Sequence, residues 1–105
     1  MNILFVCSRN EWRSPTAETI YKDHDFINAK SAGTSPSARI KINLKHMDWA
    51  DLIFVMEKKH RQLLEQRFGN NLDRQKIIVL NIPDEYQYMD EELIEELQIK
   101  VAPYL

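Results

Sequence analysis

The sequence has 105 residues, of which 44% are hydrophobic and 29% are charged, and its formal net charge is -2. This length suits one small domain with a modest core, and the composition is that of an ordinary soluble globular protein. A single cysteine excludes an intrachain disulfide and a zinc site built from cysteines, and the net charge argues against nucleic-acid binding. The start, MNILFVCSR, soon becomes charged and no long apolar segment follows, so we expect a cytoplasmic protein without a membrane partner.

Apolar runs and helical spacing alternate along the chain. Short apolar runs predict strands over 2–6, 29–31, 51–56 and 76–82. Helical spacing predicts helices over 15–23, 42–50, 57–68 and 90–101. Strands that alternate with helices are joined by parallel crossovers, so the sequence predicts a single domain of the α/β class with a doubly wound sheet.

Each predicted helix carries residues that we expect to face the core. They are Ala17, Ile20 and Tyr21 in the first, Leu44, Met47 and Trp49 in the second, Leu63, Leu64 and Phe68 in the third, and Leu93, Ile94, Leu97 and Val101 in the fourth. Ser14 is predicted to cap the first helix with Pro15 in its first position, and Gly69-Asn70 to end the third. The segment 35–41, rich in serine, proline and basic residues, is predicted to be a loop.

A cysteine and an arginine lie where the first strand meets the first helix, in the sequence Cys7-Ser8-Arg9-Asn10-Glu11-Trp12-Arg13. A strand, a short loop and a helix N-terminus form an anion site, because unpaired backbone N–H groups and the positive end of the helix dipole converge there. A phosphate held by these groups and by Arg13 would present its phosphorus to the Cys7 sulfur. The thiolate is favoured in such surroundings, and its attack would give a thiophosphate intermediate. The same spacing would also arise if Cys7 were a small buried hydrophobic residue and Arg13 a surface residue.

The segment 2–18, NILFVCSRNEWRSPTAE, resembles the phosphate loop of the low-molecular-weight protein tyrosine phosphatases, V-C-x-G-N-x-C-R-S-P-x-A-E. The resemblance implies that Cys7 is the nucleophile, that Ser14 hydrogen-bonds its thiolate and that Asn10 fixes the shape of the loop. It also implies a set of phosphate-binding residues, namely Ser8, Arg9, Asn10, Glu11, Trp12, Arg13 and Ser14. Arg9 stands in place of the family's glycine, and Trp12 in place of a second cysteine that many members carry. Trp12 either faces the substrate or packs beneath the loop.

Other matches extend the resemblance along most of the chain. Ser31-Ala32-Gly33-Thr34 resembles the family's SAGT turn, and the strand end before Glu57 resembles D-x-I-x-x-M-D, with glutamate in place of the last aspartate. The family therefore implies a four-stranded parallel sheet of order 2-1-3-4 with helices on both faces. The family runs about half as long again, and the aromatic residue that follows SAGT in the wall of its phosphotyrosine cleft is missing here. The match is to a short, divergent branch.

An acidic residue follows the fourth predicted strand. In open α/β sheets ligands bind beyond the carboxyl ends of the strands, so Asp84 should lie at the same edge as Cys7. Expulsion of an alkoxide or phenolate from phosphorus needs a proton donor, and we expect Asp84 to supply it. Asp84 and Tyr86 resemble the family's D-P-Y segment, although Pro83 precedes the aspartate here instead of following it. A loop acid or a helix cap is the alternative for Asp84.

Together these residues predict a cysteine-dependent phosphomonoester hydrolase, with protein phosphotyrosine as the default substrate class and no metal or organic cofactor. Its partners would be a phosphorylated protein or a small phosphomonoester, with inorganic phosphate or another oxyanion as ligand. Two alternatives remain open. One is an arsenate reductase that uses an external thiol, because this chain has no further cysteine for an internal relay. The other is a phosphate-binding regulatory module without turnover.

Charged residues of one sign gather in two stretches. The segment 26–47 has no acidic residue and contains Lys30, Arg39, Lys41 and Lys45, whereas 84–96 is strongly acidic. The basic stretch is either a solvated face or a rim that attracts phosphorylated substrates. The histidines show no metal-ligand spacing, so we expect surface or capping roles for His24, His46 and His60.

Overall fold

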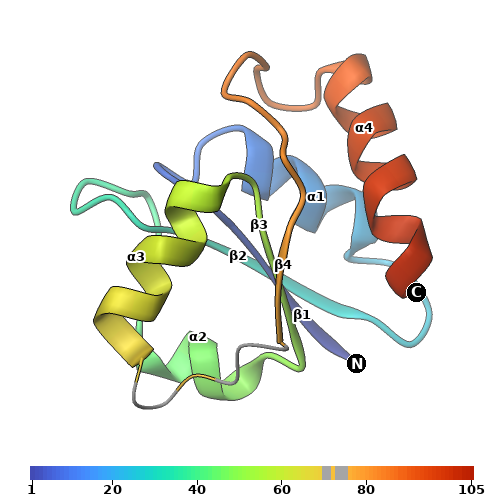
Figure 1. Cartoon of the computed structure of the whole chain (residues 1–105). Helices are drawn as coiled ribbons and strands as arrows, with labels where there is room; N and C mark the ends of the chain where they lie inside the picture. Colours follow the sequence, from blue (N-terminus) through green and yellow to red (C-terminus); the bar gives the residue numbers. More distant parts are fainter. Residues whose placement is uncertain (70–71, 73–75) are drawn as a thin grey trace.

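The computed structural model describes residues 1–69, 72 and 76–105 (Figure 1). Strands and helices alternate as β1 (Asn2–Cys7), α1 (Arg13–Tyr21), β2 (Asn28–Gly33), α2 (Leu44–Trp49), β3 (Leu52–Val55), α3 (Lys58–Phe68), β4 (Ile77–Val79) and α4 (Glu91–Val101). A short 3-10 helix, Ala102–Tyr104, ends the chain. The predicted α/β class is confirmed.

The four strands form one parallel sheet of order β2-β1-β3-β4, the predicted order. β1 is central, and its residues pair with β2 and β3 in continuous registers, such as Phe5 with Ser31 and with Phe54. The helices lie on both faces of the sheet, with α1 and α4 on one side and α2 and α3 on the other (Figure 1). The strand order reverses beside β1, so the carboxyl end of β1 lies at the switch point of the sheet.

The core has two halves, because successive strand residues point to opposite faces of the sheet. On the α1 and α4 side, Phe5 stacks on Tyr21 and on Phe54 with ring centroids 5.7 and 5.5 Å apart. On the other side lie Leu4, Val6, Ile53, Val55, Met47 and Leu64. The pattern of near-continuous apolar residues in β1 and β3 is that of strands covered on both faces.

Most residues expected in the helix cores are buried. Ala17, Tyr21, Met47, Leu64, Leu93, Leu97 and Val101 are all buried, whereas Ile20, Trp49, Leu63, Phe68 and Ile94 are half-buried. Leu44 was wrongly placed in the core. It is 43% exposed because α2 begins at this residue, one step after its N-cap Asn43.

Several predicted boundaries also differ from the structure. α1 begins at Arg13, so Ser14 lies inside the first turn and is not the N-cap, which is Trp12. β4 covers only 77–79, although Leu80 and Ile82 still donate backbone hydrogen bonds to Val55 and Met56. The helix stop at Gly69 is confirmed as the C-cap of α3, and Asn70 lies outside the described residues. No helix among the described residues has the length and apolar character needed to cross a bilayer.

Candidate active site

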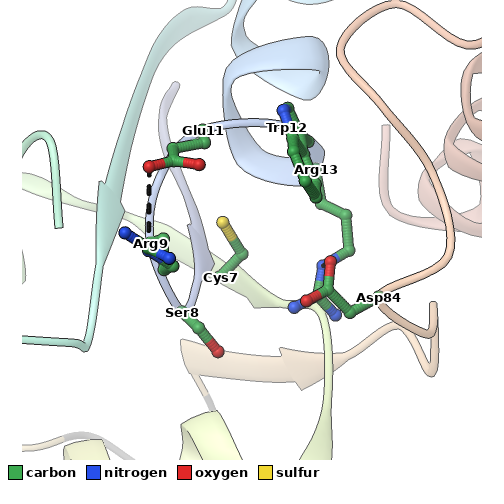
Figure 2. A pocket seen from close by; sticks show the side chains of 7 residues that line it. All are labelled: Cys7, Ser8, Arg9, Glu11, Trp12, Arg13 and Asp84. Atoms are coloured by element: carbon green, nitrogen blue, oxygen red, sulfur yellow. Dashed lines mark ion pairs between the residues drawn. The ribbon is translucent and has the colours of Figure 1, made fainter.

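A pocket of about 130 Å³ lies at the carboxyl edge of the sheet, where the loop after β1 turns into α1 (Figure 2). It is lined by Cys7, Ser8, Arg9, Glu11, Trp12, Arg13 and Asp84. Six of these residues come from one short stretch of chain, and Asp84 joins them from beyond β4. The structure therefore brings the predicted cysteine, arginine and aspartate to one site.

Arg13 is buried at this site, with only 2% of its side chain exposed. Its Nη1 donates to the Oε2 atom of Glu57 at 2.6 Å and to the carbonyl oxygen of Ile82 at 2.8 Å. Burial of the Glu57 carboxyl acts to raise its pKa, but the hydrogen bond and charge of Arg13 outweigh burial and hold that pKa below its usual value. The ion pair with Glu57 offsets the cost of burying the guanidinium charge, and together with the bond to Ile82 it fixes the plane of the guanidinium.

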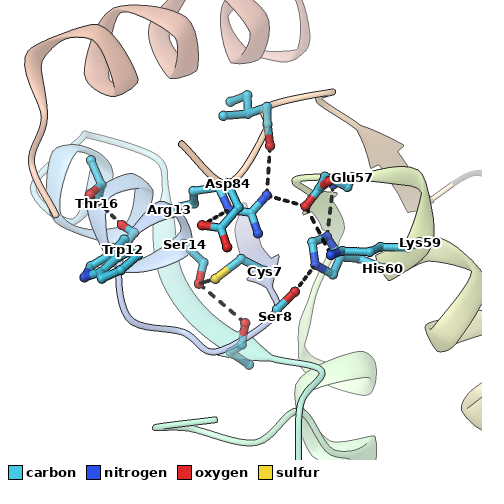
Figure 3. A network of polar contacts seen from close by, with 12 residues as sticks. Cys7, Ser8, Trp12, Arg13, Ser14, Thr16, Glu57, Lys59, His60 and Asp84 are labelled. Carbon is cyan, nitrogen blue, oxygen red and sulfur yellow. Dashed lines mark hydrogen bonds and ion pairs between the residues drawn. The ribbon is translucent and has the colours of Figure 1, made fainter. Parts of the chain in front are cut away.

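Cys7 belongs to a buried polar network beneath the loop (Figure 3). Its Sγ atom lies 2.9 Å from the Oγ atom of Ser14. Asn10 donates from Nδ2 to the hydroxyls of Ser14 and Ser31, at 2.8 and 2.9 Å, and Ser31 donates in turn to Glu18. The structure thus brings Ser14 and Asn10 into contact beside Cys7, while the roles that the resemblance implies for them stay predictions.

Asn10 adopts a left-handed backbone conformation with φ 56°, which asparagine tolerates better than most residues. This turn sends the chain from the β1 direction into α1. Within the described residues the Oδ1 atom of Asn10 is buried without a hydrogen-bond partner.

The turn after β2 packs directly against the loop. The N–H groups of Thr34 and Ser35 donate to the carbonyl oxygens of Cys7 and Ser8, at 3.0 and 2.8 Å. A Cβ atom added to Gly33 would lie 2.6 Å from the Ser8 carbonyl oxygen and 2.6 Å from the Ala38 side chain. Only glycine permits this approach, which explains its place in the Ser31-Ala32-Gly33-Thr34 turn.

Asp84 reaches the pocket from the segment after β4, despite the proline that precedes it. Its Oδ1 atom lies 3.7 Å from the Nε atom of Arg13, and 57% of its side chain is exposed. The helix-cap alternative for Asp84 is wrong, because the N-cap of α4 is Asp90. Tyr86 faces α4 in a separate hollow with Glu92, Glu95, Glu96 and Ile99, so the structure does not bring it to the Cys7 pocket.

The loop that carries Asp84 is fastened to α1 at its far end. The backbone N–H of Met89 donates to the Oγ1 atom of Thr16 at 2.9 Å, and the hydroxyls of Tyr88 and Thr19 lie 2.8 Å apart. α1 itself begins at Arg13, so the same helix orients the arginine and anchors the segment that holds the acid.

Charged and aromatic side chains form the rim of the pocket. Arg9 and Glu11 make an exposed ion pair of 3.6 Å, visible in Figure 2, and Trp12 is 42% exposed. Trp12 therefore lines the pocket and does not pack beneath the loop. Of the basic stretch 26–47, Arg39 touches the loop, donating from Nε to the Asn10 carbonyl at 3.0 Å, whereas Lys30 lies over the ring of Trp49.

His60 has a role at the site that the sequence analysis did not find. It is fully buried, and its Nε2 lies 2.8 Å from the Oγ atom of Ser8 (Figure 3). Its Nδ1 accepts the backbone N–H of Glu57 at 3.0 Å, so the expected capping role is confirmed. Burial first, and then the charge of Arg13, lowers the pKa of His60 to about 4. In the sequence, the position of His60 three residues after Glu57 indicates a helix cap, but nothing there indicates the contact with Ser8.

The donor set suits an oxyanion and not a metal. The buried guanidinium of Arg13 and the start of α1 lie beside the cysteine in one pocket, a setting that favours phosphate-like anions. Among the residues that the structure describes, no group of three or more His, Cys, Asp or Glu side chains could hold a metal ion.

Comparisons with known proteins agree with this geometry. No protein-family model matches the chain. A protein-arginine-phosphatase of Bacillus subtilis (strain 168) is 31% identical over 101 residues, which cover 70% of this chain and 67% of the relative. Among solved structures, a low-molecular-weight protein tyrosine phosphatase of Streptococcus pyogenes has a TM-score of 0.79 and 19% identity, over 99% of this chain and 93% of that one.

The tyrosine phosphatase Wzb of Escherichia coli K30, solved in complex with phosphate, has a TM-score of 0.77 and 21% identity, over 98% of this chain and 94% of that one. At these identities the two structures show a common fold. The Bacillus subtilis relative carries the assignment further, because the match is 31% identical and covers 67% of that relative. The chain belongs to the low-molecular-weight protein tyrosine phosphatase family of cysteine-dependent phosphatases.

Proposed function

We propose that this protein removes phosphoryl groups from phosphorylated protein side chains through a phosphocysteine intermediate. The observation that carries the proposal is that Cys7, the buried Arg13 and Asp84 line the same pocket. In the first step the Cys7 sulfur attacks phosphorus in line, the sulfur–phosphorus bond forms, and the bond to the leaving group breaks. Asp84 gives its proton to the leaving group.

In the second step water attacks the phosphocysteine. Asp84, now ionised, accepts a proton from that water, the sulfur–phosphorus bond breaks, and inorganic phosphate and the Cys7 thiolate are released. Arg13 holds the equatorial oxygens in both steps. Its Nη1 is already bound by Glu57 and Ile82, so the guanidinium is oriented before the substrate arrives and leaves other N–H groups for the phosphate.

We further propose phosphoarginine as the preferred substrate. The curated relative is named a protein-arginine-phosphatase, and the rim of this pocket carries, besides the proposed acid Asp84, the carboxylate of Glu11. A guanidinium leaving group has N–H donors that such carboxylates accept well, whereas a phenol ring offers them none. Phosphotyrosine remains the second candidate, because the exposed ring of Trp12 could stack on an aromatic side chain.

A pair of peptides of one sequence, phosphorylated on either arginine or tyrosine, tests this preference. We expect a higher kcat/KM for the phosphoarginine peptide, and a loss of roughly tenfold for that peptide alone in Glu11→Gln, the cost of one charge-assisted hydrogen bond. Cys7→Ser should abolish turnover of both while it retains phosphate binding. A preference for phosphotyrosine that Glu11→Gln leaves unchanged would assign the tyrosine substrate instead. Tight phosphate binding by the native protein without turnover would support a binding module.

We infer a cytoplasmic location for this reaction, because a nucleophilic cysteine must stay reduced and cytoplasmic thiols are kept so. The partner on this proposal is a phosphorylated protein, with inorganic phosphate as product and competing ligand. Nucleic-acid and membrane partners remain predicted to be absent on the strength of the net charge of -2 and the sequence pattern.

A further inference from the structure

We infer that His60 is a positioning residue of the phosphatase reaction, because it and Glu57 at the start of α3 hold both ends of the phosphate loop. His60 binds Ser8 at the beginning of the loop, and Glu57 binds Arg13 at its end. The inference rests on the proposed function, since it concerns the loop that holds the phosphate. Its test includes a binding measurement that does not depend on turnover.

The two residues that hold the loop are also bonded to each other. The N–H of Glu57 donates to Nδ1 of His60 at 3.0 Å, and the N–H of His60 donates to the carbonyl oxygen of Glu57 at 3.0 Å. One turn of backbone therefore determines the relative positions of the histidine ring and the carboxylate. Neither end of the loop can move away from α3 without loss of a half-buried hydrogen bond.

The hydrogen bonds of His60 assign its proton. Nδ1 accepts a backbone N–H, so in the neutral ring the proton sits on Nε2. Nε2 then donates to the Oγ atom of Ser8, and the ring is a fixed donor and not a base for that hydroxyl. The lowered pKa of about 4 keeps the ring in this neutral form at neutral pH.

Ser8 is consequently held from two sides. Its carbonyl oxygen accepts the N–H of Ser35 at 2.8 Å, and its side chain accepts from His60. Ser8 follows Cys7 directly and lines the pocket. Because the orientation of the loop amides determines how well they fit a phosphate, a bond that fixes Ser8 should raise phosphate affinity without touching the phosphate.

The chain offers a matched control in His46. In α2 this histidine occupies the same third helical position, and its Nδ1 accepts the N–H of the N-cap Asn43 at 3.1 Å. The hydrogen bonds of its ring and of its backbone N–H are made to Asn43, at the start of α2, and not to the phosphate loop. An asparagine at either position keeps a side-chain oxygen for the helix cap, but asparagine at 60 is too short to reach Ser8.

The experiment compares His60→Asn, Ser8→Ala, the double variant and His46→Asn. Each is measured for its affinity for inorganic phosphate by direct titration, for kcat and KM with para-nitrophenyl phosphate, and for Tm. We expect His60→Asn and Ser8→Ala each to weaken phosphate binding by roughly fivefold to tenfold, the value of one hydrogen bond. The double variant should lose little more than either single one, because both remove the same contact. His46→Asn, which keeps the cap, should change phosphate affinity not at all and Tm little.

A purely structural role for His60 would lower Tm and leave the phosphate affinity of the folded protein unchanged, which would overturn the inference. Fully additive losses in the double variant would also overturn it. If His60→Asn fails to fold, Ser8→Ala alone decides, because it removes the same bond without touching α3. An absence of turnover in every protein, the native one included, would defeat the proposed function but leave the phosphate titration to test the loop contact.

Discussion

The hydroxyl of Ser14 lies between the sulfur of Cys7 and the side-chain amide of Asn10. Its Oγ atom already accepts a hydrogen bond from Asn10, so its own hydrogen must point elsewhere. The carbonyl oxygen of Ala32 is 3.5 Å away, whereas the Sγ atom of Cys7 is at 2.9 Å. A thiolate can only accept, so when Cys7 is ionised for attack the Ser14 hydroxyl donates to its sulfur and stabilises the attacking form.

Ser14→Ala should remove this donor and lower kcat by roughly 10- to 100-fold at neutral pH, the range expected for a hydrogen bond to a charged group. The rate of alkylation of Cys7 by iodoacetamide at neutral pH should fall as well. Ser37→Ala, in the exposed loop after the Gly33 turn, is the control and should change neither quantity. An alkylation rate equal to that of the native protein would show that the Ser14 hydroxyl does not donate to the sulfur.

Asp84→Asn should lower kcat by roughly 10²–10⁴ for substrates with poor leaving groups, the usual contribution of a general acid. Aryl phosphates with strongly acidic phenols should lose much less, because their leaving groups need little protonation. The measurement is kcat across a series of aryl phosphates of graded phenol acidity. An equal loss across the series would assign Asp84 to the positioning of Arg13, whose Nε lies 3.7 Å from its carboxylate.

The buried His60 predicts a loss of stability in mild acid. Its pKa is about 4 in the folded protein, below the value near 6.5 of a free histidine, so the unfolded chain binds more protons between these two values. The free energy of unfolding should therefore fall as the pH drops from about 6.5 to 4, by about 3 kcal/mol at most. Urea unfolding at intervals of pH measures it. His60→Asn should have a flatter profile, and an unchanged slope in that variant would remove His60 as the cause.

The sequence predicts the fold well, because the patterns that define it are local. The apolar runs around Phe5 and Phe54 mark strands covered on both faces, and their alternation with helices determines a parallel sheet. The start of α1 was misplaced because Ser14 has two possible uses. In the sequence, a serine before proline is a typical helix cap. In the folded protein the Ser14 hydroxyl instead binds Cys7 and Asn10, and the helix begins one residue earlier.

The contacts that hold the site together could not be predicted from local pattern. Ser8 and His60 are 52 positions apart, and Arg13 and Glu57 are 44 positions apart. Both contacts exist because β1 and β3 are neighbours in the sheet, so that the loop after one strand meets the helix start after the other. The family resemblance identified Glu57 only as a replaced aspartate, and it offered no signal for the histidine that binds the loop.

The last prediction concerns oxidation of Cys7. Peroxide converts a reactive thiolate to a sulfenic acid, which a neighbouring thiol can trap as a reversible disulfide. Trp12 occupies the position where many family members carry that second cysteine, and it lines the same pocket as Cys7. Because Cys7 is the only cysteine of the sequence, the sulfenic acid should proceed to sulfinic acid. We expect peroxide to inactivate the protein with poor recovery after addition of dithiothreitol.

Two comparisons make this test specific to the pocket. Bound phosphate should slow inactivation, because it occupies the space that peroxide must enter to reach the sulfur. Trp12→Cys should restore part of the recovery, since it returns a thiol to the pocket wall. A peroxide time course, followed by thiol rescue and intact-mass measurement, records both the lost activity and the added oxygen atoms. Full rescue of the native chain would contradict the prediction unless the mass revealed a sulfenamide or an intermolecular disulfide, either of which protects the sulfur without a second cysteine in the chain.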